Sequence, residues 1–123
     1  MQSHLPQTLR IPFVRRCSFA PAGNGDGVAM LLDLSLQGVY VATERLPAVG
    51  ETLTIRFGVP DNDRELMIQT VVAWLQTEQT HPVHGLPVGF GARFQKVEIE
   101  DIRVIARTIQ RYCESNPIYR QYL

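Results

Sequence analysis

One short segment, residues 33–38, combines side chains that could recognise a nucleotide. Asp33 offers a carboxylate that can accept two parallel hydrogen bonds, as the N–H groups on the Watson–Crick edge of guanine require. Ser35 lies two residues later, so in an extended strand its hydroxyl shares a face with that carboxylate. Gly38 tolerates a positive φ and lets a ring or a phosphate approach the backbone closely. With an arginine such as Arg10, whose fork fits guanine or phosphate, these residues predict a site that reads a guanine nucleotide.

The same hexapeptide also has a purely structural interpretation. Aspartate and serine side chains often bond to nearby backbone amides in turns, and glycine is common in turns as well. The six residues alone therefore fit an ordinary turn as well as a ligand site.

The composition indicates one ordinary globular domain. The chain has 123 residues, of which 45% are hydrophobic and 20% are charged. Its 12 basic and 12 acidic side chains cancel, which argues against a general DNA-binding or membrane-binding protein. Cys17 and Cys113 are not expected to form a disulfide. No segment resembles a signal peptide or a membrane span, so we expect a cytoplasmic protein without membrane insertion.

Short strand-forming runs separated by turn residues are typical of a small barrel or sandwich. The expected strands cover residues 11–19, 28–34, 39–43, 52–57, 66–75 and 88–94. Beyond residue 98 the apolar spacing changes to three and four, which predicts an amphipathic helix that ends at Asn116. We therefore expect a mainly β fold, a six-stranded antiparallel barrel with one C-terminal α-helix. Residues 1–9 would form an arm, residues 10–114 the barrel and helix, and residues 115–123 a tail that either packs on the body or offers a docking surface.

The expected helix has two distinct faces. Ile102, Ile105 and Ile109, followed by Tyr112 or Cys113, form an apolar stripe that should pack on the barrel. Three arginines at a spacing of four residues lie off this stripe, and they form either a solvated face or a surface for a partner. These are Arg103, Arg107 and Arg111.

Five segments, in order along the chain, resemble the landmarks of the PilZ domain family. Residues 10–12 resemble the start of the family's first strand, and residues 32–39 resemble its central Asp/Asn-x-Ser-x-x-Gly motif with apolar flanks. The other three landmarks are residues 47–51, 71–74 and 89–94. The resemblance implies a PilZ-like barrel without catalytic activity. It also implies that cyclic di-GMP binds between an N-terminal arginine box and the central motif.

The sequence departs from this family at the arginine box, which has the pattern Arg-x-x-x-Arg. If Arg10 is the second arginine of the box, the first is replaced by Pro6. Arg15 and Arg16 are possible substitutes. Arg16 would share a strand face with Arg10 but lie about 20 Å along the strand, and Arg15 would need a bulge to leave the opposite face. Losing one arginine contact, worth about 1.5–3 kcal/mol, would weaken binding by about 10- to 150-fold.

The sequence leaves two functions open. The first is a non-catalytic receptor that binds cyclic di-GMP and relays the signal to an unidentified effector protein. In this function Arg10 would contact a phosphate or guanine, Asp33 and Ser35 would contact a guanine edge, and Gly38 would allow close approach. The second is a PilZ-fold interaction module that binds no nucleotide and acts in type IV pilus or motility machinery.

No catalytic, metal or cofactor site is expected. Ser35 lacks the Gly-x-Ser-x-Gly elbow of a serine nucleophile, so we do not expect an enzyme. His81 and His84 are interpreted as loop residues, because no further ligands accompany them in the sequence. Trp74 and Phe94 are interpreted as core side chains at strand spacing, not as stacking platforms.

Overall fold

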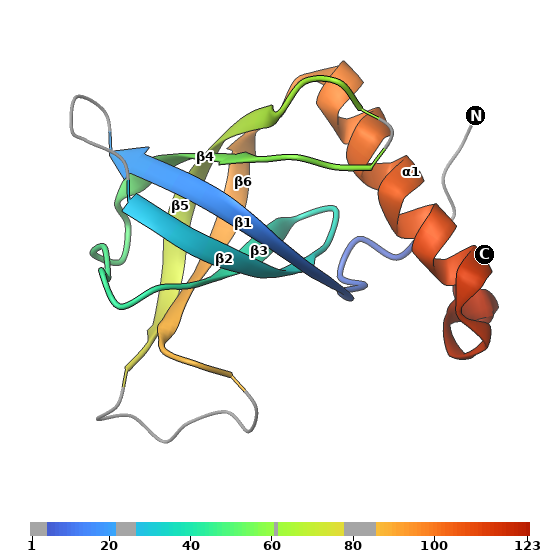
Figure 1. The fold of residues 1–123 in the computed structure, drawn as a ribbon, viewed down its shortest axis with the longest axis horizontal. Coiled ribbons are helices and arrows are strands. Elements are labelled where there is room, and N and C mark those ends of the chain that lie inside the picture. Colours follow the sequence, from blue (N-terminus) through green and yellow to red (C-terminus); the bar gives the residue numbers. More distant parts are fainter. Residues whose placement is uncertain (1–4, 22–26, 61, 78–85) are drawn as a thin grey trace.

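Six antiparallel strands form a barrel, and one long helix packs beside it (Figure 1). The computed structural model describes residues 5–21, 27–60, 62–77 and 86–123. The elements are β1 Ile11–Pro21, β2 Gly27–Leu34, β3 Gly38–Ala42, β4 Thr52–Phe57, β5 Leu66–Gln76, β6 Gly89–Lys96, α1 Ile99–Ser115 and the 3-10 helix η1 Pro117–Tyr122. The strands pair in the order β1-β2-β3-β6-β5-β4, and β4 pairs with β1 to close the barrel. The fold expected from the sequence is therefore confirmed.

The alternation of side chains explains why these segments form strands and where the core lies. In β4, Leu53, Ile55 and Phe57 are fully buried, whereas Thr52 and Arg56 are exposed. The other strands contribute apolar side chains from the same inner face, so the interior of the barrel is filled.

Irregular strand register changes which side chains face outward. Between Pro12 and Arg15, β1 places two residues opposite a single residue of β2. A shift between Val72 and Trp74 on β5 likewise reverses the alternation. Val72 belongs to the core, but Trp74 lies half-buried on the outer face, so its interpretation as a core residue is wrong. Phe94 does pack against the core.

The helix α1 packs on the barrel through one side. Ile105, Ile109 and Cys113 are buried at spacings of four residues. Glu100 and Asp101 occupy the first turn, where negative charge complements the helix dipole. Within the described residues, no helix combines the length and the apolar character needed to cross a membrane.

Ile102 departs from the predicted apolar stripe. It is 45% exposed, whereas Ile105 is 1% exposed. Ile102 points in a similar direction but lies nearer the start of the helix, where the barrel covers it only in part. The packed stripe is therefore shorter than the sequence pattern suggests.

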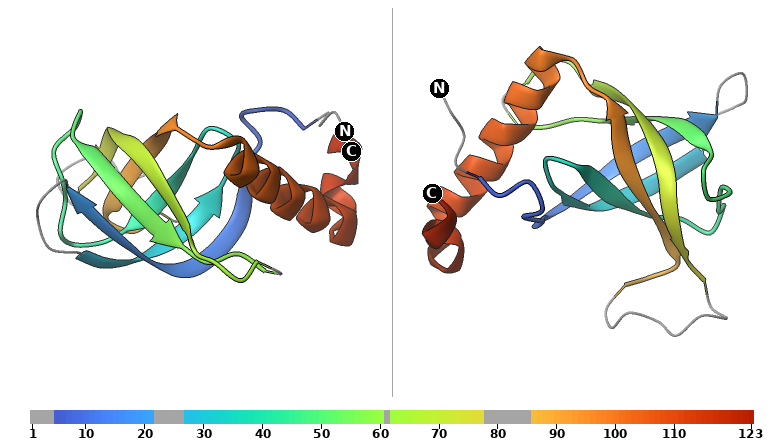
Figure 2. Two further views of the ribbon diagram at one scale, coloured as in Figure 1. Left: turned by 90° about the horizontal axis from the view of Figure 1, so that it is seen from above. Right: turned by 180° about the vertical axis from the view of Figure 1, so that it is seen from behind.

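Both ends of the described chain pack against the body. Leu5 is buried in the core, and the segment that follows it runs beside α1 in the views of Figures 1 and 2. At the other end, η1 folds back on α1, and the rings of Tyr119 and Tyr112 meet edge to face with their centroids 5.1 Å apart. The tail therefore lies against α1 through Tyr119, whereas its Ile118 is 80% exposed.

The different burial of two isoleucines on α1 predicts different costs for the same substitution. Ile109→Ala removes a fully buried side chain and should lower the free energy of unfolding by about 2–5 kcal/mol. Ile102→Ala removes a half-exposed side chain, so we expect a loss below about 1.5 kcal/mol. Urea denaturation followed by circular dichroism measures both values. Equal losses would contradict the packing of α1 described above.

Candidate functional site

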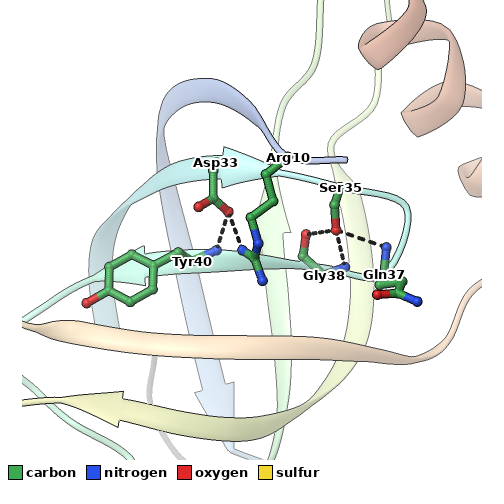
Figure 3. A network of polar contacts seen from close by, with 6 residues as sticks. All are labelled: Arg10, Asp33, Ser35, Gln37, Gly38 and Tyr40. Atoms are coloured by element: carbon green, nitrogen blue, oxygen red, sulfur yellow. Dashed lines mark hydrogen bonds and ion pairs between the residues drawn. The ribbon is translucent and has the colours of Figure 1, made fainter. Parts of the chain in front are cut away.

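An ion pair between Arg10 and Asp33 forms the centre of the candidate site (Figure 3). Arg10 directly precedes β1, and Asp33 lies near the end of β2, in register with Pro12 of β1 and Tyr40 of β3. Arg10 Nη1 donates to Asp33 Oδ1 at 2.9 Å, and the backbone N–H of Tyr40 donates to the same oxygen at 3.0 Å. The carboxylate therefore joins the segment before β1 to the β2–β3 hairpin.

The surroundings of Asp33 raise its pKa. Partial burial removes water from the carboxylate and raises the pKa above its ordinary value of 3.8. The positive charge of Arg10 and the hydrogen bond from Tyr40 oppose this rise without cancelling it. The side chain of Arg10 is 49% exposed, so solvent screens its attraction for Asp33. Desolvation is therefore the larger effect on this carboxylate.

Ser35 closes a tight turn between β2 and β3 (Figure 3). Its backbone N–H and its hydroxyl both donate to the carbonyl of Gly38, at 3.0 and 3.2 Å. The hydroxyl also accepts from the backbone N–H groups of Gln37 and Gly38, each at 3.1 Å. Ser35 is 2% exposed, so its hydroxyl serves the turn and is not presented to a ligand.

Gly38 is required by the packing of two strands. A Cβ atom on this residue would overlap the carbonyl oxygen of Ala92 on β6, which pairs with β3 at this point. Among the described glycines, Gly50 is the one with a positive φ, so Gly38 does not use the left-handed conformation anticipated from the sequence. Its contribution is the close approach of two backbones.

A shallow hollow of about 180 Å³ lies beside this network on the outer face of the barrel. Arg10, Gln37 and Gly38 line it together with Trp74 from β5 and Arg93 from β6. Arg93 is in register with Gly38 across the β3–β6 pair, which brings a second guanidinium to the site. The hollow therefore combines positive charge with an aromatic surface.

Trp74 and Arg93 are site residues that the sequence interpretation missed. The Trp74 ring lies over Gly91, where a Cβ atom would overlap it, and its centroid is 5.3 Å from that of Tyr40. Gly91 is in register with both aromatic residues, so the three residues lie side by side on adjacent strands. Residues 89–94 contain the pattern that could have predicted both. A glycine in a strand leaves room for a neighbouring ring, and strand alternation places Arg93 on the same face as Gly91.

Arg15 and Arg16 are not brought to this hollow. Despite the bulge in β1, Arg15 stacks over the ring of Phe13, 5.0 Å from its centroid, at the opening beside α1. Arg16 is exposed and in register with Met30, three residues before Asp33 on β2. The structure therefore places neither of the two predicted substitutes beside Arg10 in the hollow.

The arrangement can hold a flat anionic ligand. The Trp74 ring offers a stacking surface, and the guanidiniums of Arg10 and Arg93 can bind phosphate oxygens. Both described bonds of Asp33 end on Oδ1, so Oδ2 can accept from N–H groups on the edge of a base.

The described part of the chain contains no group of three or more histidine, cysteine, aspartate or glutamate side chains that could hold a metal ion. His81 and His84, interpreted above as loop residues, lie outside the described residues. The candidate site is therefore defined by its arginines, its carboxylate and its aromatic ring.

Comparison with known proteins identifies one matching family. A family model described as PilZ domain matches residues 6–115. No curated protein sequence matches the chain. The family match includes the residues on both sides of the hollow.

Three solved structures are similar to this fold. The inhibitor of motility MotI/DgrA of Bacillus subtilis has a TM-score of 0.71 at 13% identity over 90% of this chain, which spans 52% of that protein. The PilZ domain of CeSA from a cellulose-synthesizing bacterium has a TM-score of 0.56 at 16% identity, over 81% of this chain and 93% of that one. The PilZ domain of YcgR from Escherichia coli, solved with c-di-GMP, has a TM-score of 0.58 at 17% identity, over 87% of this chain and 93% of that one. At these identities the likeness establishes the fold alone.

The raised pKa of Asp33 predicts a pH-dependent difference between the wild-type chain and Asp33→Asn. The variant keeps an oxygen acceptor for Tyr40 but cannot ionise. Because the folded-state pKa lies above 3.8, the stabilising contribution of Asp33 is fully present below that pH and is lost as the pH rises through the folded-state pKa. The wild-type free energy of unfolding should therefore fall relative to that of the variant as the pH rises from about 3.5 to about 6.5. Urea denaturation at both pH values measures this, and a difference that grows in favour of the wild type would show that the ion pair dominates.

The close approach at Gly38 predicts a loss of stability that is independent of any ligand. Gly38→Ala places a methyl group against the Ala92 carbonyl and should cost roughly 1–3 kcal/mol in the free energy of unfolding. Gly58→Ala is the matched control, since no atom lies within 4 Å of its Cβ position, and it should be neutral or stabilising by up to about 1 kcal/mol. Chemical denaturation compares the two variants. A neutral Gly38→Ala would refute the packing role.

Proposed function

The chain belongs to the PilZ domain family, and on this premise we propose that it is a non-catalytic receptor for cyclic di-GMP that relays the signal to a partner protein in the cytoplasm. The ligand would occupy the hollow on the outer face of the barrel. The observation that carries the proposal is the position of the Arg10–Asp33 ion pair, which stands beside an aromatic ring and a second guanidinium.

Each residue around the hollow has a role suited to this ligand. Arg10 and Arg93 would bind phosphate oxygens or the acceptor edge of guanine. Trp74 would stack on a base, and Asp33 would accept hydrogen bonds from the Watson–Crick edge of guanine through Oδ2. Ser35 would act through the turn that holds Asp33 in place, without touching the ligand.

Arg93 supports binding despite the incomplete arginine box. Pro6 removes one charge-assisted contact, typically worth about 1.5–3 kcal/mol. Arg93 lines the same hollow as Arg10 and can supply a contact of the same kind. The expected loss of affinity is therefore smaller than the sequence alone suggests.

A second candidate function is a nucleotide-free interaction module of motility or type IV pilus machinery. Two observations favour it: Pro6 stands where the family has an arginine, and neither Arg15 nor Arg16 reaches the hollow. The similarity in fold to an inhibitor of motility is consistent with such a role, although this chain spans only about half of that protein, 52% of its length.

Calorimetric titration of the purified chain with cyclic di-GMP tests the first function. We expect saturable binding with a Kd of about 10 μM or tighter, equivalent to about −7 kcal/mol. Trp74 is the only tryptophan of the chain, so its fluorescence should change over the same concentration range. Arg10→Ala, Arg93→Ala and Asp33→Asn should each weaken binding by about tenfold or more, because each removes a charged contact.

Three controls define the result. Arg56→Ala removes an exposed arginine of β4 outside the hollow and should leave the affinity unchanged. Cyclic di-AMP and GTP should bind more weakly than cyclic di-GMP. Absence of heat and of any fluorescence change at about 1 mM ligand, a Kd above the millimolar range, would reject the receptor in favour of the interaction module.

A further inference from the structure

Tyr40 is fully buried although it faces outward from the barrel. Its neighbours on β3, Val39 and Val41, belong to the core, so strand alternation turns Tyr40 to the outer face. Tyr40 is nevertheless only 1% exposed, which means that other groups cover its ring. Trp74 is one of them, since its ring centroid lies 5.3 Å from that of Tyr40 and the two ring planes are inclined by 30°. The tyrosine therefore packs against the aromatic residue of the hollow.

Two glycines of β6 make room for this aromatic pair. Gly91 is in register with Tyr40 on β3 and with Trp74 on β5, and a Cβ atom on it would overlap the Trp74 ring. A Cβ atom on Gly89 would lie 2.9 Å from the Tyr40 hydroxyl. The Trp74 ring therefore crosses β6 and reaches Tyr40, and a side chain at either glycine would displace one of the two rings.

Tyr40 is also held by two hydrogen bonds. Its backbone N–H donates to Asp33 Oδ1 at 3.0 Å (Figure 3), and its hydroxyl donates to the carbonyl of Pro87 at 2.5 Å. Tyr40 thus contacts Asp33 through its backbone and Trp74 through its ring. One residue therefore fixes the carboxylate and the stacking ring of the hollow relative to each other.

We propose that Tyr40 is a positioning residue, whose ring holds the Trp74 ring in place at the hollow before a ligand arrives. The inference rests on the proposed function, which assigns Trp74 the role of stacking on a base. Ordering a side chain during binding costs free energy, and an aromatic contact that already exists removes this cost. Tyr40 acts without touching the ligand, because its own ring is covered.

Tyr40→Leu tests the proposal, because it removes the ring and keeps an apolar side chain. Trp74 is the only tryptophan of the chain, so its fluorescence reports on this one ring in the absence of any ligand. We expect its emission to shift to the red and acrylamide to quench it more strongly than in the wild-type chain, since the side that faces Tyr40 becomes open to water. Binding of cyclic di-GMP, measured by calorimetry, should weaken by about 2- to 12-fold.

A conservative variant and a matched control separate positioning from general stability. Tyr40→Phe keeps the ring without the hydroxyl, so it should restore both the emission of Trp74 and the affinity. Phe57→Leu removes another fully buried ring, but Phe57 is in register with Leu66, at the other end of β5 from Trp74. This control should lose stability and keep the wild-type emission and affinity. An equal change of emission in Phe57→Leu would assign the effect to loosening of the whole barrel and overturn the proposal.

Gly91→Ala tests the same contact from the other side, since it keeps Tyr40 but removes the space through which the Trp74 ring reaches it. It should expose Trp74 and weaken binding in the same direction as Tyr40→Leu. Unchanged emission in a folded Tyr40→Leu or Gly91→Ala variant, or unchanged affinity in a variant with exposed Trp74, would refute the positioning role. If the wild-type chain binds no cyclic di-GMP, the proposed function fails, and the emission of the ligand-free variants still decides whether Tyr40 holds Trp74.

Discussion

Closure of the small barrel determines where chemistry is possible in this molecule. The interior is filled by side chains such as Leu31, Ile55 and Phe90, each fully buried, so charged groups have to lie on the outer face or at an end. The Arg10–Asp33 ion pair lies on the outer face of the barrel, and the Arg15 side chain lies at the end of the barrel beside α1. The bulges decide which residues are available there, since each extra residue turns the following side chain to the other face of the sheet.

The hexapeptide at residues 33–38 divides its residues between folding and recognition. The hydroxyl of Ser35 is used within the turn, and Gly38 is fixed by the backbone of Ala92, so neither is reserved for a ligand. Asp33 alone retains an oxygen that its described bonds leave for another donor. Selection for a stable barrel would preserve Ser35 and Gly38 in a receptor and in an interaction module alike. An intact hexapeptide therefore says more about the fold than about the ligand.

The sequence predicts the strands, the helix and the corner at Ser35 well, because these depend on local alternation and turn chemistry. It predicts the site less completely, because a side chain's face depends on register between strands. A single register shift between Val72 and Trp74 moves the Trp74 side chain from the core to the outer face. The composition of this strand does not indicate where the shift occurs. Arg93 becomes a neighbour of Arg10 only through the pairing of β3 with β6. Ile102 fits the apolar period, yet the barrel covers it only in part.

Two consecutive residues, one directly before β1 and one at its start, line different depressions. Arg10 lines the hollow, and Ile11 lines a depression of about 360 Å³ between β1 and α1. Their Cα atoms are one step of about 3.8 Å apart, so a shift of Arg10 toward a ligand would also shift the wall of that depression. Where binding at one place does move the other, linkage makes the effect mutual and equal in size. Such coupling would need no hinge and no domain rearrangement, because one peptide unit is common to both.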